Sequence, residues 1–460
     1  MRAGAASVDI TPKLGTHLAG SGAGEHRPAR EVLDPLYARA LVLEESGRRL
    51  CIVALDVTIV TQEWTDRIRQ AAEKCGFAPG SVLVHATQTH SSPPLGHIMF
   101  DPDFPHLPES IEYLRGGETP YYEFATARAI EAIERAQARL VPVQVGLGRA
   151  VRDDLAFNRR GVQRDGRVCM PWFFAGSQQP LGPVRLSHIE GPTDPEVGVA
   201  AFRADDGRIV ALLLHHTCHP VSVFATRYYA VSADWPGAWA AAMQKRGGES
   251  CVPIVLNGCC GNINPWPAFQ PDFKPDHLRM GAALAASTAA VLDRMSFAAV
   301  NRLEWRMERI PIPLKPADPV RLDAARRTLS EHPEPLWSKN DAGRIDPAWF
   351  QAASVMSVEL MRRRGPNLLY EVQVFRIGDM AVVGLPGEPF VEGQLAIKLG
   401  ARLPFTFVAH ACTQYVGYIP MREAFPRGGH EVDFSYWAKL VPEALDTIVS
   451  TSTRLLAGTG

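Results

Sequence analysis

The sequence predicts a layered α/β fold, in which helices cover a mixed β-sheet built from hairpins and crossover helices. Two observations predict this class. Apolar strand-like runs alternate along the chain with segments of helical periodicity. Several neighbouring strand-like runs are also joined by short polar turns, which indicates antiparallel as well as parallel pairing. The 460 residues, 46% of them hydrophobic and 21% charged, supply enough apolar material for a sizeable core.

Three segments have the pattern of a β-hairpin, namely residues 39–57, 197–216 and 371–388. Each has two apolar runs on either side of a polar turn that contains Gly, which is a strong local hairpin signal. The second run of each pair is almost continuously apolar, so we expect it to lie inside a covered sheet. Further strand-like runs occupy residues 81–90, 251–258 and 405–412.

Helical periodicity is clear in four segments, residues 63–75, 121–140, 235–246 and 277–295. Residues 92–120 and 152–196 are rich in Pro, Gly and Asp and are expected to be long loops, which in compact enzymes often shape a site. Residues 314–366 are polar and carry two charged helical patterns. We expect them to form a helical excursion between the two halves of the sheet.

Charge and targeting signals narrow the range of partners. The formal net charge is -1, from 48 basic and 49 acidic residues, which gives no electrostatic reason to expect nucleic acid or an anionic membrane. The N-terminus lacks the apolar run of a signal peptide, and no stretch has the roughly 18 continuous apolar residues of a membrane helix. We therefore expect a cytoplasmic protein without a transmembrane segment. The eight cysteines do not form a disulfide-scaffold pattern.

Residues of metal-ligand type follow four of the apolar runs. His90 ends the run that begins at residue 81, and His219 follows the second hairpin. Glu388 follows the third hairpin, and Tyr418 lies beyond the run 405–412. Ligands of α/β sheets bind in the crevice beyond the strand ends, so these four side chains can converge on one ion. Imidazole and carboxylate suit zinc, which in catalytic sites keeps one position open for water.

Each of these residues alone also has a simpler structural explanation. A histidine after a strand is more often hydrogen-bonded within the fold than bound to a metal. Glu388 fits a turn or a helix start, and Tyr418 fits a buried aromatic with a bonded hydroxyl. His219 is harder to explain by packing, because three histidines fall within residues 215–219 and a proline follows them.

Short motifs recur in a definite order along nearly the whole chain. They are residues 8–12 (VDITP), the strand that leads to Asp56, and residues 87–93 (TQTHSSP), 158–159 (NR), 194–197 (DPEV), 218–220 (CHP), 232–237 (SADWPG), 261–265 (GNINP), 386–388 (PGE) and 417–418 (GY). Each is weak alone, but the ordered set resembles the neutral ceramidase family. These are the neutral/alkaline, non-lysosomal zinc amidases that split ceramide into sphingosine and fatty acid.

The resemblance is to the shorter bacterial homologues of that family's N-terminal catalytic domain. It implies that residues 1–460 form one large catalytic domain, with the helical excursion at about residues 314–366. Members of the family often carry a C-terminal immunoglobulin-like domain and a secretion signal, and we expect neither here.

The resemblance also implies one zinc ion per chain, held in the family by two His, a Glu and a Tyr. Carried over by position, His219, Glu388 and Tyr418 supply three of these ligands. The fourth, the first His of the family's Thr-His-Thr-His, is Gln88 here, and His90 matches the second His, which contacts substrate. Either Gln88 supplies an oxygen ligand, or His90, His85 or His216 takes over, or zinc affinity is lost. We expect zinc to be retained, with His90 in or beside its shell.

Two substrate-facing positions also depart from the family. Asn264 stands where the family's Gly-Asp-Val-Ser-Pro has a Ser proposed to act in catalysis, and His430 replaces a Tyr of a late substrate-contacting segment. Ceramide itself is therefore not the expected substrate.

We expect a zinc-dependent hydrolase that cleaves an amide (N-acyl) or related acyl bond of a small molecule with a metal-activated water. His90 or His430 would transfer protons to the leaving amine. Arg159 would hold a substrate carboxylate or the developing oxyanion, and Asn264 would donate a hydrogen bond. The sequence leaves a homo-oligomer open.

Other chemistries have candidates as well. A serine hydrolase would use Ser91, Ser92 or Ser232, although no Gly-x-Ser-x-Gly elbow is present. A thiol enzyme would use Cys259 or Cys260. The alternative from a different class is a non-catalytic or metal-free ligand-binding homologue that has lost the family chemistry.

Overall fold

The predicted mixed sheet is present, and a second sheet packs against it. The structure is a computed structural model that describes residues 1–20, 24–105, 107–170, 186–268, 270, 273–339 and 343–458. The large sheet has nine strands in the order β14-β12-β11-β6-β1-β3-β4-β5, with β16 beside β6. These strands are β1 (Arg2–Asp9), β3 (Tyr37–Glu45), β4 (Arg48–Leu55), β5 (Val82–Ala86), β6 (Val141–Val151), β11 (Glu196–Ala204), β12 (Ile209–His216), β14 (Val252–Asn257) and β16 (Phe297–Ala298).

The second sheet has four strands, and the sequence did not indicate that it would be separate. Its order is β17-β18-β19-β21, formed by β17 (Leu303–Pro313), β18 (Asn367–Ile377), β19 (Met380–Gly384) and β21 (Phe405–Ala409). All three predicted hairpins are confirmed as antiparallel pairs, β3–β4, β11–β12 and β18–β19. Their second strands each lie between two neighbours, as their continuous hydrophobicity predicted.

Strand alternation builds two cores from the large sheet. In β4, Leu50, Ile52 and Ala54 pack toward the second sheet, where they join Phe375 and Phe407. The intervening side chains of β4 (Cys51, Val53 and Leu55) pack on the opposite face with α1 (Gln62–Lys74) and α2 (Thr119–Ala138). Successive side chains of a strand point to opposite faces, so a continuously apolar strand fills both layers.

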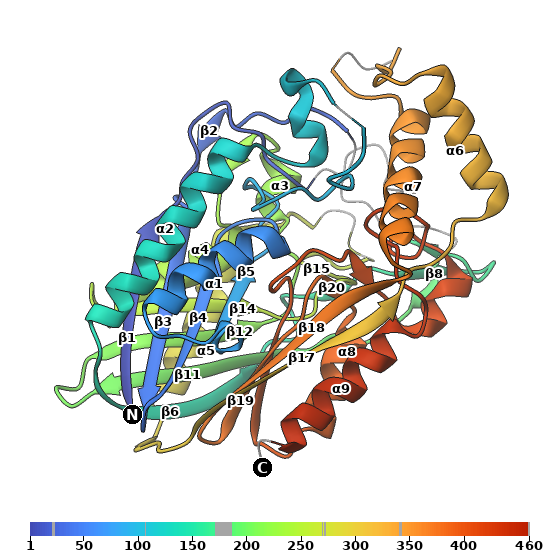
Figure 1. Cartoon of the computed structure of the whole chain (residues 1–460). Helices are drawn as coiled ribbons and strands as arrows, with labels where there is room; N and C mark the ends of the chain where they lie inside the picture. The colour runs from blue at the N-terminus through green and yellow to red at the C-terminus, as the bar shows by residue number, and fades with distance from the viewer. Residues whose placement is uncertain are drawn as a thin grey trace.

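Further helices complete a four-layer arrangement of helix, sheet, sheet and helix (Figure 1). Helices α4 (Asp234–Gly247) and α5 (His277–Leu292) cover β11 and β12 through Trp235, Trp239 and Leu284. Helices α8 (Val391–Gly400) and α9 (Ala444–Gly458) cover the outer face of the second sheet. The fold class predicted from sequence is confirmed.

The expected excursion is a pair of helices, α6 (Pro319–Glu331) and α7 (Pro347–Arg364). Each begins with an Asp whose side chain accepts from two backbone N–H groups and with Pro in the first turn. The pair connects β17 to β18, which are antiparallel neighbours in the second sheet, rather than two halves of one sheet. Trp349 and Phe350 of α7 pack on Phe100 from the predicted loop 92–120.

Short elements shape the loops. They are β2 (Glu31–Val32), β7 (Phe157–Asn158), β8 (Gly161–Gln163), β9 (Val168–Cys169), β10 (Leu186–Ile189), β13 (Ala230–Val231), β15 (Ile263–Asn264), β20 (Glu388–Pro389), β22 (Tyr418–Ile419), α3 (Ser222–Thr226), and the 3-10 turns Pro79–Ser81, Glu109–Arg115 and Arg422–Arg427. No helix in the described ranges is both long enough and apolar enough to span a membrane. All eight cysteines are free thiols, as their spacing predicted.

Candidate active site

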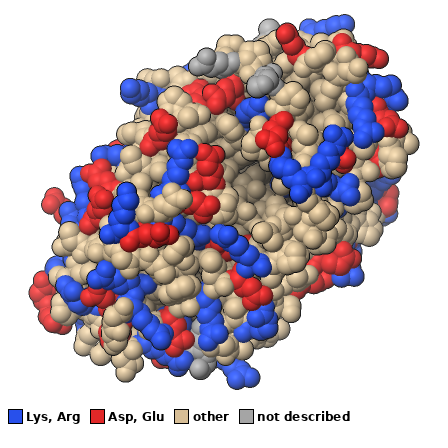
Figure 2. All heavy atoms as spheres, viewed as in Figure 1, with Lys and Arg blue, Asp and Glu red and all other residues tan. Residues whose placement is uncertain are grey.

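A cavity of about 780 Å³ lies beyond the ends of the strands that carry the predicted site residues. All eight of those residues line it, namely Gln88, His90, Arg159, His219, Asn264, Glu388, Tyr418 and His430. Figure 2 shows one face of the molecule hollowed near its middle, with charged side chains of both signs scattered around the hollow. Apolar and aromatic side chains form much of the wall, among them Ile98, Met99, Phe224, Trp266 and Trp437.

Asn257, the last residue of β14, joins the loops that bring these side chains together. Its amide nitrogen donates to Thr87 O at 3.0 Å, and its amide oxygen accepts from Cys218 N at 3.2 Å. Its backbone oxygen accepts from His410 N at 3.1 Å. The fully buried Asn257 therefore fixes the segments that follow β5, β12 and β21 against one another.

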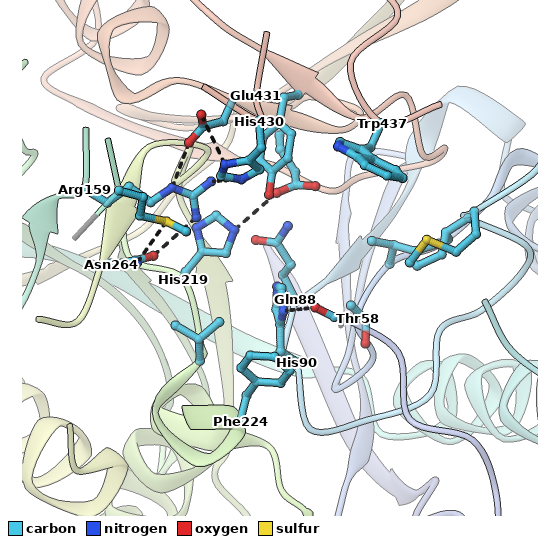
Figure 3. A pocket seen from close by; sticks show the side chains of 18 of the residues that line it. Thr58, Gln88, His90, Arg159, His219, Phe224, Asn264, His430, Glu431 and Trp437 are labelled. Carbon is cyan, nitrogen blue, oxygen red and sulfur yellow. Dashed lines mark hydrogen bonds and ion pairs between the residues drawn. The ribbon is translucent and has the colours of Figure 1, made fainter. Parts of the chain in front are cut away.

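His219 and Glu388 form a buried pair at the centre of the cavity (Figure 3). His219 Nδ1 lies 3.1 Å from the backbone oxygen of Ile263, and His219 Nε2 lies 3.2 Å from Glu388 Oε2. A carbonyl oxygen only accepts, so Nδ1 carries the proton and the lone pair of a neutral ring is on Nε2. Burial lowers the pKa of His219. Burial alone would raise the pKa of Glu388, but His219 lowers it to about 2 when Nε2 also carries a proton and donates to the carboxylate.

This pairing tests whether the residues fit a zinc ion. A neutral His219 and an ionised Glu388 face each other with two acceptor atoms, an arrangement that a cation between them satisfies. Two such atoms bound to one tetrahedral zinc lie about 3.4 Å apart, close to the separation observed. A hydrogen bond to the other ring nitrogen is also what metal-bound histidines usually have. Among the described residues, however, no group of three or more His, Cys, Asp and Glu side chains could hold a metal. His219 and Glu388 thus have the donor types of two zinc ligands.

Tyr418 lies directly beside Glu388. The two residues are register partners where β20 pairs in parallel with β22. Burial raises the pKa of the Tyr418 phenol, as does the nearby Glu388 carboxylate. Tyr415 donates to Glu388 Oε1 at 3.4 Å. His219 and Tyr415 therefore both contact the Glu388 carboxylate, and Tyr418 is its neighbour across the strand pairing.

His90 lies beside the pair. Its ring centroid is 5.5 Å from that of His219 and 5.7 Å from that of Phe224, both edge to face. Its Nδ1 lies 3.2 Å from Gly20 O, which assigns the proton to Nδ1 and leaves the Nε2 lone pair for another contact. Burial lowers the pKa of His90 to about 3. His90 is therefore a neutral imidazole whose Nε2 can accept a hydrogen bond, and its low pKa makes it a weak base.

Arg159, His430, Glu431 and Asn264 form a polar cluster on another wall (Figure 3). Arg159 Nε lies 3.1 Å from Glu431 Oε1, Nη1 lies 3.3 Å from Asn264 Oδ1, and Nη2 lies 3.2 Å from His430 Nε2. Because Arg159 only donates, His430 Nε2 must accept, and His430 Nδ1 faces Glu431 Oε2 at 3.4 Å. Antiparallel pairing of β7 with β15 continues in a bond from Arg159 N to Asn262 O, which places Arg159 near Asn264. The charge of Arg159 is thus balanced inside the protein.

Sequence reasoning missed Glu431, the centre of that cluster. Its Oε2 also lies 2.8 Å from Arg160 Nη1, and Arg160 in turn pairs with the buried Glu190. Burial alone would raise the pKa of Glu431, but His430 and Arg159 lower it to about 2. The only signal in the sequence was its position next to His430. Tyr415 was missed as well, although it lies close to Tyr418 in the chain.

The serine and thiol alternatives have no activated nucleophile in the described residues. Ser232 Oγ bonds Asp34 and Ser92 Oγ bonds Thr89 O, whereas Ser91 Oγ is buried without a partner. Cys260 Sγ lies 3.7 Å from His410 Nδ1, but it is fully buried and burial raises its thiol pKa well above the usual value. Burial also raises the pKa of Cys259. Nucleophilic catalysis requires an accessible group next to a base, which none of these provides.

Comparison with known proteins bears on the fold. No protein-family model and no curated protein matches the sequence. Among solved structures, the chain is similar to the neutral ceramidase from Pseudomonas aeruginosa, with a TM-score of 0.70 and 16% identity over 100% of this chain and 74% of that one. It is similar to a ceramidase complexed with C2 at TM-score 0.70 and 18% identity, over 99% of this chain and 75% of that one. The chain therefore has a neutral ceramidase-like fold.

Proposed function

We propose that this protein is a zinc-dependent hydrolase that cleaves an amide (N-acyl) or related acyl bond with a metal-activated water. The observation that carries the proposal is the His219–Glu388 pair, in which two acceptor atoms face each other 3.2 Å apart inside a cavity. The similarity to ceramidase structures supports an amide bond as the target.

One zinc per chain would be held by His219, Glu388 and Tyr418, with His90 beside them. Tyr418 would supply an oxygen ligand from the strand paired with that of Glu388. When bound, zinc lowers the pKa of a water toward about 7 and so supplies hydroxide at neutral pH. Tyr415 and Ile263 hold the carboxylate and the imidazole in place from behind.

The remaining roles follow from which atoms are already engaged. His90 has an available Nε2 and is the proposed proton acceptor and donor for the leaving amine. His430 Nε2 is occupied by Arg159, so His430 is better placed to bind than to transfer protons. Arg159, balanced by Glu431, would hold an oxyanion together with Asn264 rather than a substrate carboxylate.

The substrate is proposed to be a small N-acyl compound rather than ceramide. A cavity of about 780 Å³ with largely apolar walls is in the usual range for drug-sized ligands. Phe224, Trp266 and Trp437 offer contacts to an apolar acyl or amine substituent. The cytoplasmic location and the oligomeric state stay predictions.

A non-catalytic ligand-binding protein is the second candidate. The observation that favours it is the lack, among the described residues, of a three-membered His, Cys, Asp or Glu group. In that case the pocket would still bind a ligand, and the replacements at Gln88 and Asn264 would have removed the catalytic activity.

The test is turnover of a panel of small N-acyl substrates with and without chelator and added zinc. Hydrolysis that chelator abolishes and zinc restores, and that Glu388→Gln lacks, supports the proposal. Hydrolysis that resists chelation contradicts the zinc mechanism. Binding of panel members without turnover favours the second candidate. The control is Glu423→Gln, which changes an exposed glutamate outside the cavity lining.

A further inference from the structure

Gln88 holds an unusual place in the site. It lies two residues beyond β5 with a backbone φ of 68°, a left-handed conformation that is uncommon for a residue with a Cβ. Its N–H donates to Val57 O at 3.1 Å, which fixes this conformation. The side chain is only 1% exposed and lines the cavity. Figure 3 shows the Gln88 side chain extending into the pocket beside His219. A strained, buried amide that reaches the centre of a site calls for a functional explanation.

The neighbours of Gln88 determine which way its amide points. Cys260 Sγ lies 3.3 Å from Gln88 Oε1, and burial keeps the thiol protonated, so the thiol donates to that oxygen. The sulfur already faces a donor, Asn257 Nδ2, at 3.7 Å. The orientation of Asn257 is in turn fixed by its bonds to Thr87 O and Cys218 N. Oxygen toward the thiol is therefore the complementary orientation for Gln88.

This orientation turns the amide nitrogen of Gln88 toward the cavity. No acceptor for Nε2 is found among the described residues, so its N–H groups are available to a bound molecule. An oxygen ligand for a metal would instead require Oε1 to leave Cys260, which would place the amide nitrogen against the sulfur.

We propose that Gln88 donates a hydrogen bond from its amide nitrogen to the acyl oxygen of the substrate, and that Cys260 positions it to do so. This inference rests on the proposed function. The acyl oxygen gains negative charge as the carbonyl is attacked, and a preoriented N–H next to the metal pair stabilises that charge. Gln88 is then a catalytic residue and not a zinc ligand, and Cys260 is a positioning residue.

The experiment compares Gln88→Met and Gln88→Glu with the wild type by two measurements. Zinc affinity is determined by competition with a chromogenic chelator, and kcat/KM is determined on the best N-acyl substrate of the wild type. Both variants should bind zinc at least as tightly as the wild type, because neither change removes a ligand. Both should lose kcat/KM by about 100-fold, mostly in kcat, since each removes the N–H donor.

Three further variants complete the design. Cys260→Ala should lower kcat by a smaller factor and leave zinc affinity unchanged, because the amide loses only its orientation. Gln144→Met, an exposed glutamine on β6, should change neither quantity. Gln88→Asn keeps the donor on a shorter side chain and should lose kcat as well, because its N–H no longer reaches.

A fall in zinc affinity of more than about 10-fold in Gln88→Met would make Gln88 a ligand or its support and overturn the proposal. So would an unchanged kcat/KM in both Gln88→Met and Gln88→Glu. Failure of the proposed function itself gives a different result, because the wild type would then neither bind zinc nor hydrolyse any substrate.

Discussion

Glu388 and Tyr418 are direct partners across the parallel pairing of β20 and β22, so they are neighbours although they follow different strands of the second sheet. Their backbones are tied as well, because Glu388 N donates to Gly417 O at 2.9 Å. Gly417 has a φ of 84°, and a Cβ there would lie 2.3 Å from Trp437 O. Main-chain pairing thus positions Glu388 and Tyr418, and the loop after β12 positions His219.

The contact between Gly20 and His90 gives a test with an internal control. A Cβ on Gly20 would lie 2.6 Å from His90 Nδ1, whereas Gly15 has a similar positive φ and no atom within 4 Å. Replacing either glycine by Ala should cost about 1–2 kcal/mol in folding free energy, because both are left-handed. Only Gly20→Ala should also lower kcat/KM, by displacing the proposed proton-transfer residue. Equal activity of the two variants, measured alongside thermal unfolding, would argue against that role for His90.

Removing the charge of Glu431 should affect both stability and catalysis. Glu431→Gln leaves Arg159 without a carboxylate partner and Arg160 with Glu190 alone, in a buried cluster. Breaking a buried pair of this kind destabilises by about 3–5 kcal/mol, to be measured by denaturant unfolding. We also expect a lower kcat, because Arg159 and His430 lose their orientation.

The control for Glu431 is Glu443→Gln, which removes an exposed partner of Arg422. It should change the free energy of unfolding by no more than about 1 kcal/mol. Similar effects of the two substitutions would contradict an organising role for Glu431.

Packing of the helical excursion should influence substrate binding from a distance. Trp349 of α7 is fully buried against Phe100 and Phe104, and the neighbouring Ile98 and Met99 line the cavity. Trp349→Ala should lower the free energy of unfolding by about 3–5 kcal/mol and raise KM more than it lowers kcat. Trp337→Ala, at a residue that is 47% exposed, should do neither. An unchanged KM in Trp349→Ala would show that the excursion does not support this wall.

Asp194 should make stability depend on pH. Its Oδ2 lies 2.6 Å from both Lys398 Nζ and Gln394 Nε2. Burial alone would raise the pKa of Asp194, but Lys398 lowers it to about 2 from 3.8. A carboxyl whose pKa is lower in the folded chain stabilises above its unfolded pKa and loses that contribution as the pH falls through the folded value.

Asp194→Asn should therefore lower the free energy of unfolding at pH 7 by about 2 kcal/mol. The difference from the wild type should shrink as the pH falls from 3.8 toward about 2. Denaturant unfolding at a series of pH values measures both quantities, with the exposed Asp206→Asn as control. A difference that stays constant over this range would contradict the assignment.

Local pattern was enough to predict the three hairpins, the helices α1, α2, α4 and α5, the helical pair α6 and α7, and part of the cavity lining, but it did not predict α3, α8 or α9. A hairpin depends on residues that are close together in the sequence, namely two apolar runs and the Gly-containing turn between them. His219, Glu388 and Tyr418 follow strand-like runs, and this position can be recognised without knowing how the strands pair. The separate second sheet was not predictable in this way. A strand such as β4 is apolar on both faces, and its pattern does not state whether a helix or a sheet covers each one.

Polar contacts between residues far apart in the chain could not be predicted from the sequence either. Glu431 and Arg160 lie far apart in the chain, and neither has a periodic neighbour that indicates burial. From its sequence neighbours alone, Cys260 is interpreted as a small apolar residue that follows a strand. Its hydrogen bond to Gln88 exists only because β14 and β5 end at the same place in the folded molecule.

The most direct test of the central claim is the zinc content of the purified protein by elemental analysis, with His219→Ala and His188→Ala beside the wild type. His188 is an exposed histidine, so its removal controls for adventitious binding. We predict about one zinc per chain in the wild type and in His188→Ala, and a loss of that zinc in His219→Ala. A wild type that takes up no zinc even when it is supplied, or a His219→Ala variant that keeps it, would contradict a metal site at His219 and Glu388.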